Sequence, residues 1–217
     1  MTETLNIAQI CPETRALGPG KRFVIWVQGC PFNCAGCVSP DWIPVKTANV
    51  VAVRDLARLI TESDDLEGIT ISGGEPALQG SGLASLLSIV KAVKPNLSVI
   101  AFSGFTIEQL RKKSTAQVGV REFLAHLDVL IDGLYVKGLN DGLGMRGSSN
   151  QRVHFLTDRY AALREVFESR VRQVEVHLLS DGLLMVGVPT RRALETFSSL
   201  AGEMKKRGGK VTGPRHG

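Results

Sequence analysis

Long apolar runs, a cationic leader and abundant cysteine are all missing from this chain of 217 residues. No apolar run approaches the ~18 residues that cross a bilayer, and Met1-Thr2-Glu3-Thr4 is not a basic stretch followed by an apolar one. We therefore expect no membrane span and a cytoplasmic location. Basic residues interleaved with aromatic ones, which a nucleic-acid platform needs, are also missing, so the sequence argues against a nucleic-acid partner.

Cysteine is scarce but unevenly placed. Of the four cysteines, Cys30, Cys34 and Cys37 fall within eight residues. Such crowding is typical of metal ligation in a reducing compartment and not of a disulfide framework. Cys11 stands apart, and we interpret it as a buried thiol because free cysteine is commonly buried.

The length and a hydrophobic content of 43% suit one domain with a sizeable core. Lysine and arginine gather near the C-terminus among glycines, from Lys205 to Arg215. We predict a single domain over residues 1–207 and a flexible basic tail over 208–217.

Strand-like and helix-like patterns alternate along the first two thirds of the chain. The predicted strands lie at 22–28, 68–72, 97–102 and 127–131. Alternation of this kind indicates an α/β fold with a parallel sheet and helical crossovers. Because there are too few units for an eight-fold barrel, we expect a partial, open parallel β/α barrel.

Beyond Asp132 the pattern changes. A glycine-rich stretch, Gly138 to Gly147, precedes a predicted helix near 160–168. The stretches 174–178 and 183–188 predict a hairpin, and spaced apolar residues from Leu194 onward predict a final amphipathic helix.

The three crowded cysteines form a C-x3-C-x2-C motif directly after a predicted strand. This spacing offers three thiolates and no obvious fourth ligand. A four-iron four-sulfur cube with three thiolates keeps one iron open to a small molecule, whereas a structural zinc site normally uses four ligands. The alternative is a zinc site with a distant histidine, for which His126, His154 and His177 are candidates without a supporting spacing.

A second motif, Gly73-Gly74-Glu75-Pro76, follows the next predicted strand about forty residues later. The glycines permit positive φ and close approach to a ligand. The carboxylate of Glu75 can accept hydrogen bonds from an ammonium group.

Together the two motifs resemble the radical S-adenosylmethionine superfamily. The resemblance implies a 4Fe-4S cluster on Cys30, Cys34 and Cys37, with S-adenosylmethionine bound at the open iron. It implies a partial barrel and a reaction that yields a 5′-deoxyadenosyl radical. The residues implied to contact S-adenosylmethionine are Gly36, Cys37, Val38, Gly73, Gly74 and Glu75.

Three further features resemble the family of activating proteins of anaerobic ribonucleoside-triphosphate reductase. They are Gly18-Pro19-Gly20-Lys21-Arg22, Gly36 before the third cysteine, and Met145 to Arg152. The resemblance implies an oxidoreductase that takes a hydrogen atom from a glycine of a partner enzyme, with a one-electron donor such as flavodoxin or ferredoxin. Val38 departs from the family, which usually has an aromatic residue or histidine there.

Other interpretations stay open. Direct radical modification of a peptide or small molecule is one, and a non-catalytic iron–sulfur module for electron transfer or binding is another. Ser148-x-x-Gln151 could be a helix capping box, and Asp132-Gly133 could be a turn or a ligand contact. The stretch Gly138 to Gly147, together with Arg146, Ser148, Asn150 and Arg152, is our candidate for the partner-facing surface.

Overall fold

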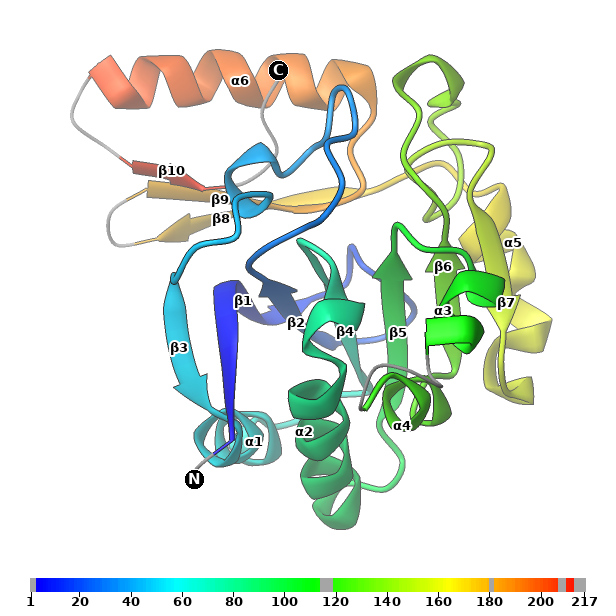
Figure 1. The fold of residues 1–217 in the computed structure, drawn as a ribbon. Coiled ribbons are helices and arrows are strands. Elements are labelled where there is room, and N and C mark those ends of the chain that lie inside the picture. Colours follow the sequence, from blue (N-terminus) through cyan, green and yellow to red (C-terminus); the bar gives the residue numbers. More distant parts are fainter. Residues whose placement is uncertain (1–2, 114–118, 180–181, 207–209, 213–217) are drawn as a thin grey trace.

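The computed structural model describes residues 3–113, 119–179, 182–206 and 210–212. The described residues form an α/β fold whose main sheet has seven strands (Figure 1). These strands are β1 (Thr4–Thr14), β2 (Arg22–Val27), β3 (Asn49–Ala52), β4 (Gly68–Gly73), β5 (Ser98–Ser103), β6 (Val129–Asp132) and β7 (Arg152–Phe155). Their order across the sheet is β3-β1-β2-β4-β5-β6-β7.

Strands β2, β4, β5 and β6 run parallel to one another, which confirms the predicted α/β class. The sheet as a whole is mixed, because β1 and β3 at one edge and β7 at the other pair antiparallel. These three strands were missing from the prediction. The pairing of β1 with β2 is irregular at two places, which breaks the period of two by which a strand is recognised. Strands β3 and β7 have four residues each.

Helices cover one face of the main sheet (Figure 1). They are α1 (Val53–Glu62), α2 (Gly80–Val93), α3 (Ile107–Lys113) and α4 (Val120–Ala125). The shorter elements are α5 (Arg164–Glu168) and the 3-10 turns η1 (Pro40–Trp42), η2 (Pro76–Gln79), η3 (Lys137–Leu139) and η4 (Asp158–Leu163). The predicted helix near 160–168 is confirmed as η4 followed by α5.

Both faces of the parallel strands are buried. In β2, Phe23, Ile25 and Val27 join the core beneath the helices, while Val24 and Trp26 join a second core on the opposite face. Two covered faces explain why this strand is a continuous apolar run instead of an alternating one.

A smaller sheet contains β8 (Val174–Leu179), β9 (Gly182–Gly187) and β10 (Lys210–Thr212), in the order β10-β9-β8. It confirms the predicted hairpin, and α6 (Arg191–Lys206) confirms the final helix. Strand β10 falls within the expected tail and pairs parallel with β9. Positions 208–209 and 213–217 of that expected tail lie outside the described residues.

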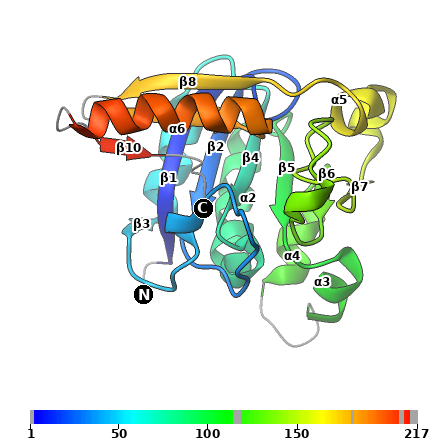
Figure 2. The ribbon, with the colours of Figure 1, turned by 90° about the horizontal axis from the view of Figure 1, so that it is seen from above.

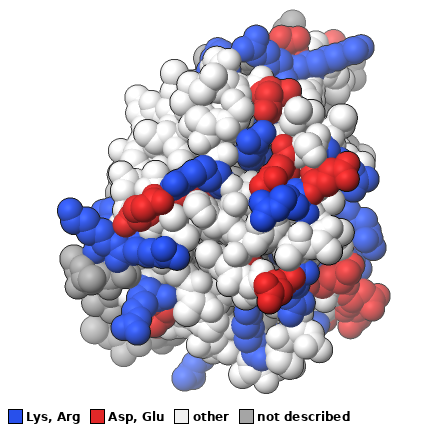
Figure 3. Space-filling model, turned by 90° about the vertical axis from the view of Figure 1, so that its right-hand side faces the viewer, with Lys and Arg blue, Asp and Glu red and all other residues white. Residues whose placement is uncertain are grey.

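The small sheet and α6 lie beyond the carboxyl ends of the parallel strands, above them in Figure 1 and across them in Figure 2. Leu184 and Val186 of β9 pack with Trp26 and Trp42 in the second core. The face next to β7 and α5 mixes acidic and basic side chains (Figure 3). Within the described ranges, no helix is long and apolar enough to cross a bilayer.

Candidate functional site

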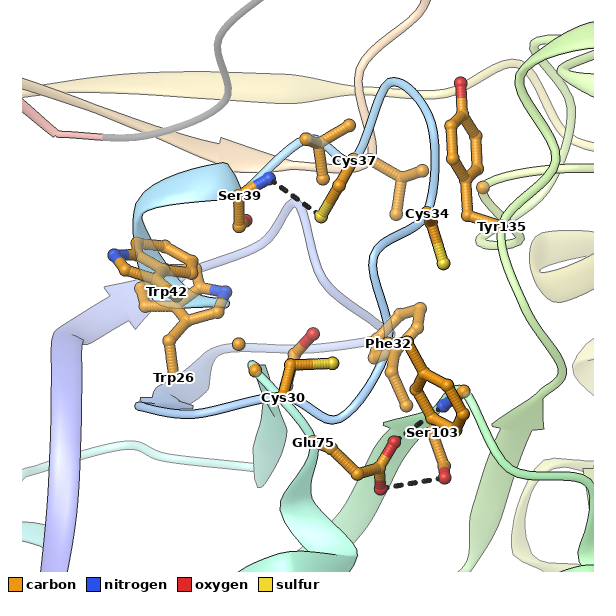
Figure 4. A pocket seen from close by; sticks show the side chains of 18 of the residues that line it. Trp26, Cys30, Phe32, Cys34, Cys37, Ser39, Trp42, Glu75, Ser103 and Tyr135 are labelled. Carbon is orange, nitrogen blue, oxygen red and sulfur yellow. Dashed lines mark hydrogen bonds between the residues drawn. The ribbon is translucent and has the colours of Figure 1, made fainter. Parts of the chain in front are cut away.

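A cavity lies at the carboxyl ends of the parallel strands, where ligands bind in open α/β sheets. The cysteines line it from the loop after β2, Glu75 lines it from the turn after β4, and Ser103 lines it from the end of β5 (Figure 4). The two motifs singled out in the sequence therefore face one space, although about forty residues separate them.

Backbone hydrogen bonds close the base of the cysteine loop. Gly29 N donates to Trp42 O and Cys30 N donates to Ile43 O, both at 2.9 Å. Cys37 N donates to Cys34 O at 3.0 Å, which forms a turn between the second and third cysteines. The loop therefore leaves and re-enters the end of β2 at a defined position.

All three thiols are free and partly exposed. Burial raises the pKa of Cys30 to about 11 and raises the pKa of Cys37, which also receives the backbone N–H of Ser39 at 3.4 Å. Metal binding at such thiols displaces their protons, since the thiolate is the ligand.

The thiols surround the cavity without converging on one point. Among the described residues, no three side chains of His, Cys, Asp or Glu are grouped closely enough to hold a single metal ion. A zinc ion with Zn–S bonds of about 2.3 Å would draw its thiolates to within roughly 4 Å of each other. Three separated thiols around a shared space suit a larger cluster, which spreads its ligands over several irons.

The histidines of the zinc alternative lie elsewhere. His126 Nε2 is 3.4 Å from Ser88 Oγ, and His177 Nε2 is 3.1 Å from Glu175 Oε2. His154 Nε2 lies 2.9 Å from Asp132 Oδ2, off the hydrogen-bonding direction. The geometry therefore supports three thiol ligands without a histidine. Cys11 is buried, as predicted, beside His177.

The two glycines of the second motif, Gly73 and Gly74, lie in close contact with the backbone at and just after the end of β2. Gly73 has φ +108°, and a Cβ there would lie 2.4 Å from Val27 N. A Cβ on Gly74 would lie 2.2 Å from Gly29 O. Gly74 N donates to Val27 O at 2.7 Å. The close approach predicted at these glycines is thus to the end of β2.

The carboxylate of Glu75 is 1% exposed and accepts three hydrogen bonds, of which the one from Ser103 can be followed in Figure 4. One oxygen receives Ala77 N and Ser103 Oγ, both at 2.9 Å, and the other receives Gly104 N at 2.8 Å. Burial raises the pKa of Glu75 to about 6 despite these donors. The side chain ties the end of β4 to the end of β5, a role that sequence reasoning missed.

Gly36 has φ +74°, a conformation that favours glycine. A Cβ at this position would lie 2.9 Å from Lys137 Cδ, so the side chain of Lys137 packs against Gly36. The next-but-one residue, Val38, lines the cavity.

Aromatic residues that the sequence analysis did not single out complete the walls. Trp26 and Trp42 contact each other with tilted rings whose centroids lie 5.5 Å apart, and Phe32 makes a T-shaped contact with Phe105 at 4.7 Å. A Cβ on Gly104 would lie 2.6 Å from the Phe32 ring. Phe32 lies within the cysteine motif, and Trp26 and Trp42 lie within five residues of it. This proximity in the sequence could have identified them as residues of the site.

The segment Met145 to Arg152 is held by contacts within the chain. Arg146 pairs with Asp141 at 3.1 Å, and Asn150 donates to Leu134 O at 2.9 Å. Gln151 lines the cavity and accepts Gly147 N at 2.7 Å. Gln151 Oε1 accepts Ser148 N at 3.2 Å, as in a capping box, but β7 follows Gln151 and no helix begins there among the described residues, so the interpretation as a helix cap is wrong.

Asp132 is fully buried at the end of β6. Its carboxylate accepts Ile107 N, at the start of α3, and both Nε and Nη2 of Arg152. Arg152 also pairs with Glu108 at 2.7 Å. Asp132 therefore connects β6, α3 and β7, and these partners account for both carboxylate oxygens.

Residues 16–154 match the family described as a 4Fe-4S single cluster domain. An anaerobic ribonucleoside-triphosphate reductase-activating protein from Enterobacteria phage T4 is 31% identical over 159 residues, which cover 71% of this chain and 96% of that protein. The protein of that name from Vibrio cholerae is 29% identical over 161 residues, 70% of this chain and 99% of that protein. A pyruvate formate-lyase-activating enzyme from Streptococcus mutans is 36% identical over 80 residues, 34% of this chain and 30% of that enzyme.

The fold, the cysteine loop and these matches define an iron–sulfur enzyme of the radical S-adenosylmethionine class, of the glycyl-radical activating type. Within this class, the chain belongs to the family of the anaerobic ribonucleoside-triphosphate reductase-activating proteins.

Proposed function

We propose that this chain binds a 4Fe-4S cluster and S-adenosylmethionine and abstracts a hydrogen atom from a glycine of a partner enzyme. The observation that carries the proposal is that the cysteine loop and the Gly-Gly-Glu-Pro turn face one cavity at the carboxyl ends of β2 and β4. When bound, the cluster and S-adenosylmethionine supply one-electron cleavage to methionine and a 5′-deoxyadenosyl radical.

The residues of the chain hold and orient these groups. Cys30, Cys34 and Cys37 would ligate the cluster. Glu75 would present its carboxylate edge, already fixed by Ser103 and Gly104, to the methionine end of S-adenosylmethionine. The other proposed contacts to S-adenosylmethionine are Gly36, Cys37 and Val38 on the nucleoside side and Gly73 and Gly74 on the methionine side.

The two tryptophans and Phe32 would exclude water from this space, which protects a reactive radical from side reactions. We further propose that the four parallel strands are the core of a partial, open barrel and that residues 1–207 act as one domain. We place the protein in the cytoplasm, with a glycyl-radical enzyme as partner and flavodoxin or ferredoxin as the electron donor.

Anaerobic reconstitution with iron and sulfide tests the cofactor. We expect about four irons and four sulfides per chain. Cys34→Ala should lose them, whereas Cys11→Ala, at the buried cysteine outside the cavity, should retain them. Stoichiometric zinc without iron in the wild-type protein would contradict the proposal.

Reaction of the reconstituted protein with dithionite and S-adenosylmethionine tests the chemistry. We expect 5′-deoxyadenosine, measured by chromatography, and a glycyl radical on the partner, measured by electron paramagnetic resonance. A bound cluster without 5′-deoxyadenosine would instead identify a non-catalytic iron–sulfur module. A product radical on a small molecule in the absence of any protein partner would identify direct modification.

A further inference from the structure

The C-terminal part of the chain lies beyond the family match, which ends at residue 154. The alignment with the T4 relative includes 96% of that protein but only 71% of this chain. This chain is therefore longer than the T4 protein. The residues beyond the match include α5, the β8–β9 hairpin and α6. These elements lie outside the stretch that matches the family.

This C-terminal part supplies one wall of the cavity. Met185, Gly187, Val188 and Pro189 line the cavity from β9 and the residues that follow it. Glu175 of β8 fastens the hairpin to the end of β1 by accepting hydrogen bonds from Thr14 Oγ1 and Arg15 N at 2.6 and 2.8 Å. The wall is apolar and is held in a fixed position.

Arg172 connects the same C-terminal part to the neighbouring glycine-rich loop, Gly138 to Gly147. Its guanidinium is 1% exposed and donates to Asn140 Oδ1 at 2.7 Å. It also donates to the backbone carbonyls of Leu143, Gly144 and Gly147, each at 3.3 Å. Because Asn140 and Gly147 line the cavity, one buried side chain fixes the glycine-rich loop that borders the site.

The chemistry of the walls restricts what can bind beside the cofactor. None of the described residues that line the cavity is Lys, Arg, His or Asp. The carboxylate of Glu75 is the only one among them, and protein donors already contact both of its oxygens. Phosphate and carboxylate groups are recognised by cationic side chains, above all by arginine. The amides of Asn140 and Gln151 are likewise engaged within the chain. The apolar side chains of Met185, Val188 and Pro189 therefore suit an uncharged ligand segment.

We propose that Met185, Gly187, Val188 and Pro189, together with the glycine-rich loop that Arg172 holds, form a substrate-recognition wall that selects an uncharged peptide segment and disfavours anionic substrates. This inference rests on the proposed function, according to which the bound segment is a loop of the partner enzyme that contains the reacting glycine. Val188 contacts the segment, and Arg172 acts through the loop that it holds and is a positioning residue.

The first test uses the reconstituted full-length protein with two blocked heptapeptides, each with a central dideuterated glycine. One peptide has uncharged flanking residues and the other has a glutamate on each side of the glycine. Dithionite supplies the electron that breaks the C5′–S bond of S-adenosylmethionine and releases methionine. A deuterium atom then passes from the glycine α-carbon to C5′, and the peptide retains the unpaired electron. The measured quantity is deuterium in 5′-deoxyadenosine.

We expect the uncharged peptide to give at least ten times more deuterated product than the acidic peptide. Val188→Lys places a cation on the wall, so the ratio of product from the uncharged peptide to product from the acidic peptide should fall at least tenfold. The matched control is Val171→Lys, at a position 73% exposed and outside the cavity, which should keep the wild-type ratio. A ratio in Val188→Lys equal to that of the wild type overturns the inference, as does transfer from neither peptide.

The second test addresses Arg172 without using activity. Arg172→Gln should increase hydrogen exchange at least tenfold over residues 140–147 and leave exchange in β4 and β5 unchanged. Arg170→Gln, an exposed arginine two residues away, is the control. Wild-type exchange over 140–147 in Arg172→Gln would overturn the positioning role. If the wild-type protein binds iron and produces 5′-deoxyadenosine, failure of either test refutes the recognition wall alone. Absence of both cofactor properties refutes the proposed function instead.

Discussion

Glu75 N donates to Gly29 O at 2.8 Å, one residue before the first cysteine of the motif. This bond joins the acidic turn after β4 to the base of the cysteine loop after β2. The position of Cys30 therefore depends on the conformation of the Gly-Gly-Glu-Pro turn. Substitutions in that turn should affect the iron–sulfur site even where no cofactor is contacted.

Gly74→Ala should destabilise the protein and also reduce its iron content. A Cβ at this position would lie 2.2 Å from Gly29 O, so the ends of β2 and β4 must separate. We expect a loss of about 1–3 kcal/mol in the free energy of unfolding, which is typical of overpacking. Denaturant unfolding and iron analysis measure the two effects. Gly138→Ala is the matched control, since a Cβ there meets nothing within 4 Å. Full iron content in Gly74→Ala would show that the two loops are independent.

Glu75→Gln should destabilise the fold although it preserves the shape of the side chain. One carboxylate oxygen accepts Gly104 N, and an amide –NH2 in its place would face that donor. A buried donor left without a partner costs about 1–3 kcal/mol. Denaturant unfolding measures the change, with the exposed Glu122→Gln as control. An unchanged free energy of unfolding would mean that the Gly104 N–H finds another acceptor.

Arg22→Met should cost at least about 3 kcal/mol of stability, because it leaves several buried acceptors without a donor. The guanidinium is fully buried, and its Nε donates to Thr70 Oγ1 at 2.6 Å. Its Nη2 donates to Ile69 O at 2.6 Å, and its Nη1 donates to Ser98 Oγ at 3.0 Å. Thermal and denaturant unfolding test the value against the exposed Arg54→Met. A loss below 1 kcal/mol would refute a structural role for this arginine of the Gly-Pro-Gly-x-Arg motif.

His126 should contribute to acid sensitivity. Burial, reinforced by Lys91, holds the pKa of His126 below its ordinary value of 6.5 in the folded protein. The unfolded chain therefore takes up this proton first as pH falls. The contribution of His126 to stability is present above about pH 6.5 and is lost as pH falls through the depressed pKa of the folded state. Unfolding measured between pH 5 and pH 8 should show a shallower loss on the acid side for His126→Gln. An identical pH profile for the variant and the wild type would contradict this assignment.

The order of residues along the chain was sufficient to predict the parallel strands and the two motifs of the site. Strand β2 is a nearly continuous apolar run because both its faces are buried, and β5 and β6 are similarly rich in apolar residues. Strand β4 alternates isoleucine with threonine and serine and was recognisable from its β-branched isoleucine and threonine residues. The cysteine loop and the glycine turn were recognisable because ligand type and spacing are encoded within a few consecutive residues. Strand β1 was missed because bulges interrupt its alternation, and β3 and β7 were missed because their short pairing is set by distant neighbours.

Other properties arise only when distant segments meet. The sequence indicates that another group lies close to the backbone at Gly74. Only the tertiary structure shows that this group is the carbonyl oxygen of Gly29. In the same way Glu75 was expected to meet a ligand, and the fold brings Ser103 and Gly104 to it. The apolar wall of β9 and the hold of Arg172 on the glycine-rich loop carry no local signature. Such contacts join residues tens of positions apart, and their partners are decided by the packing of the whole chain and not by spacing along it.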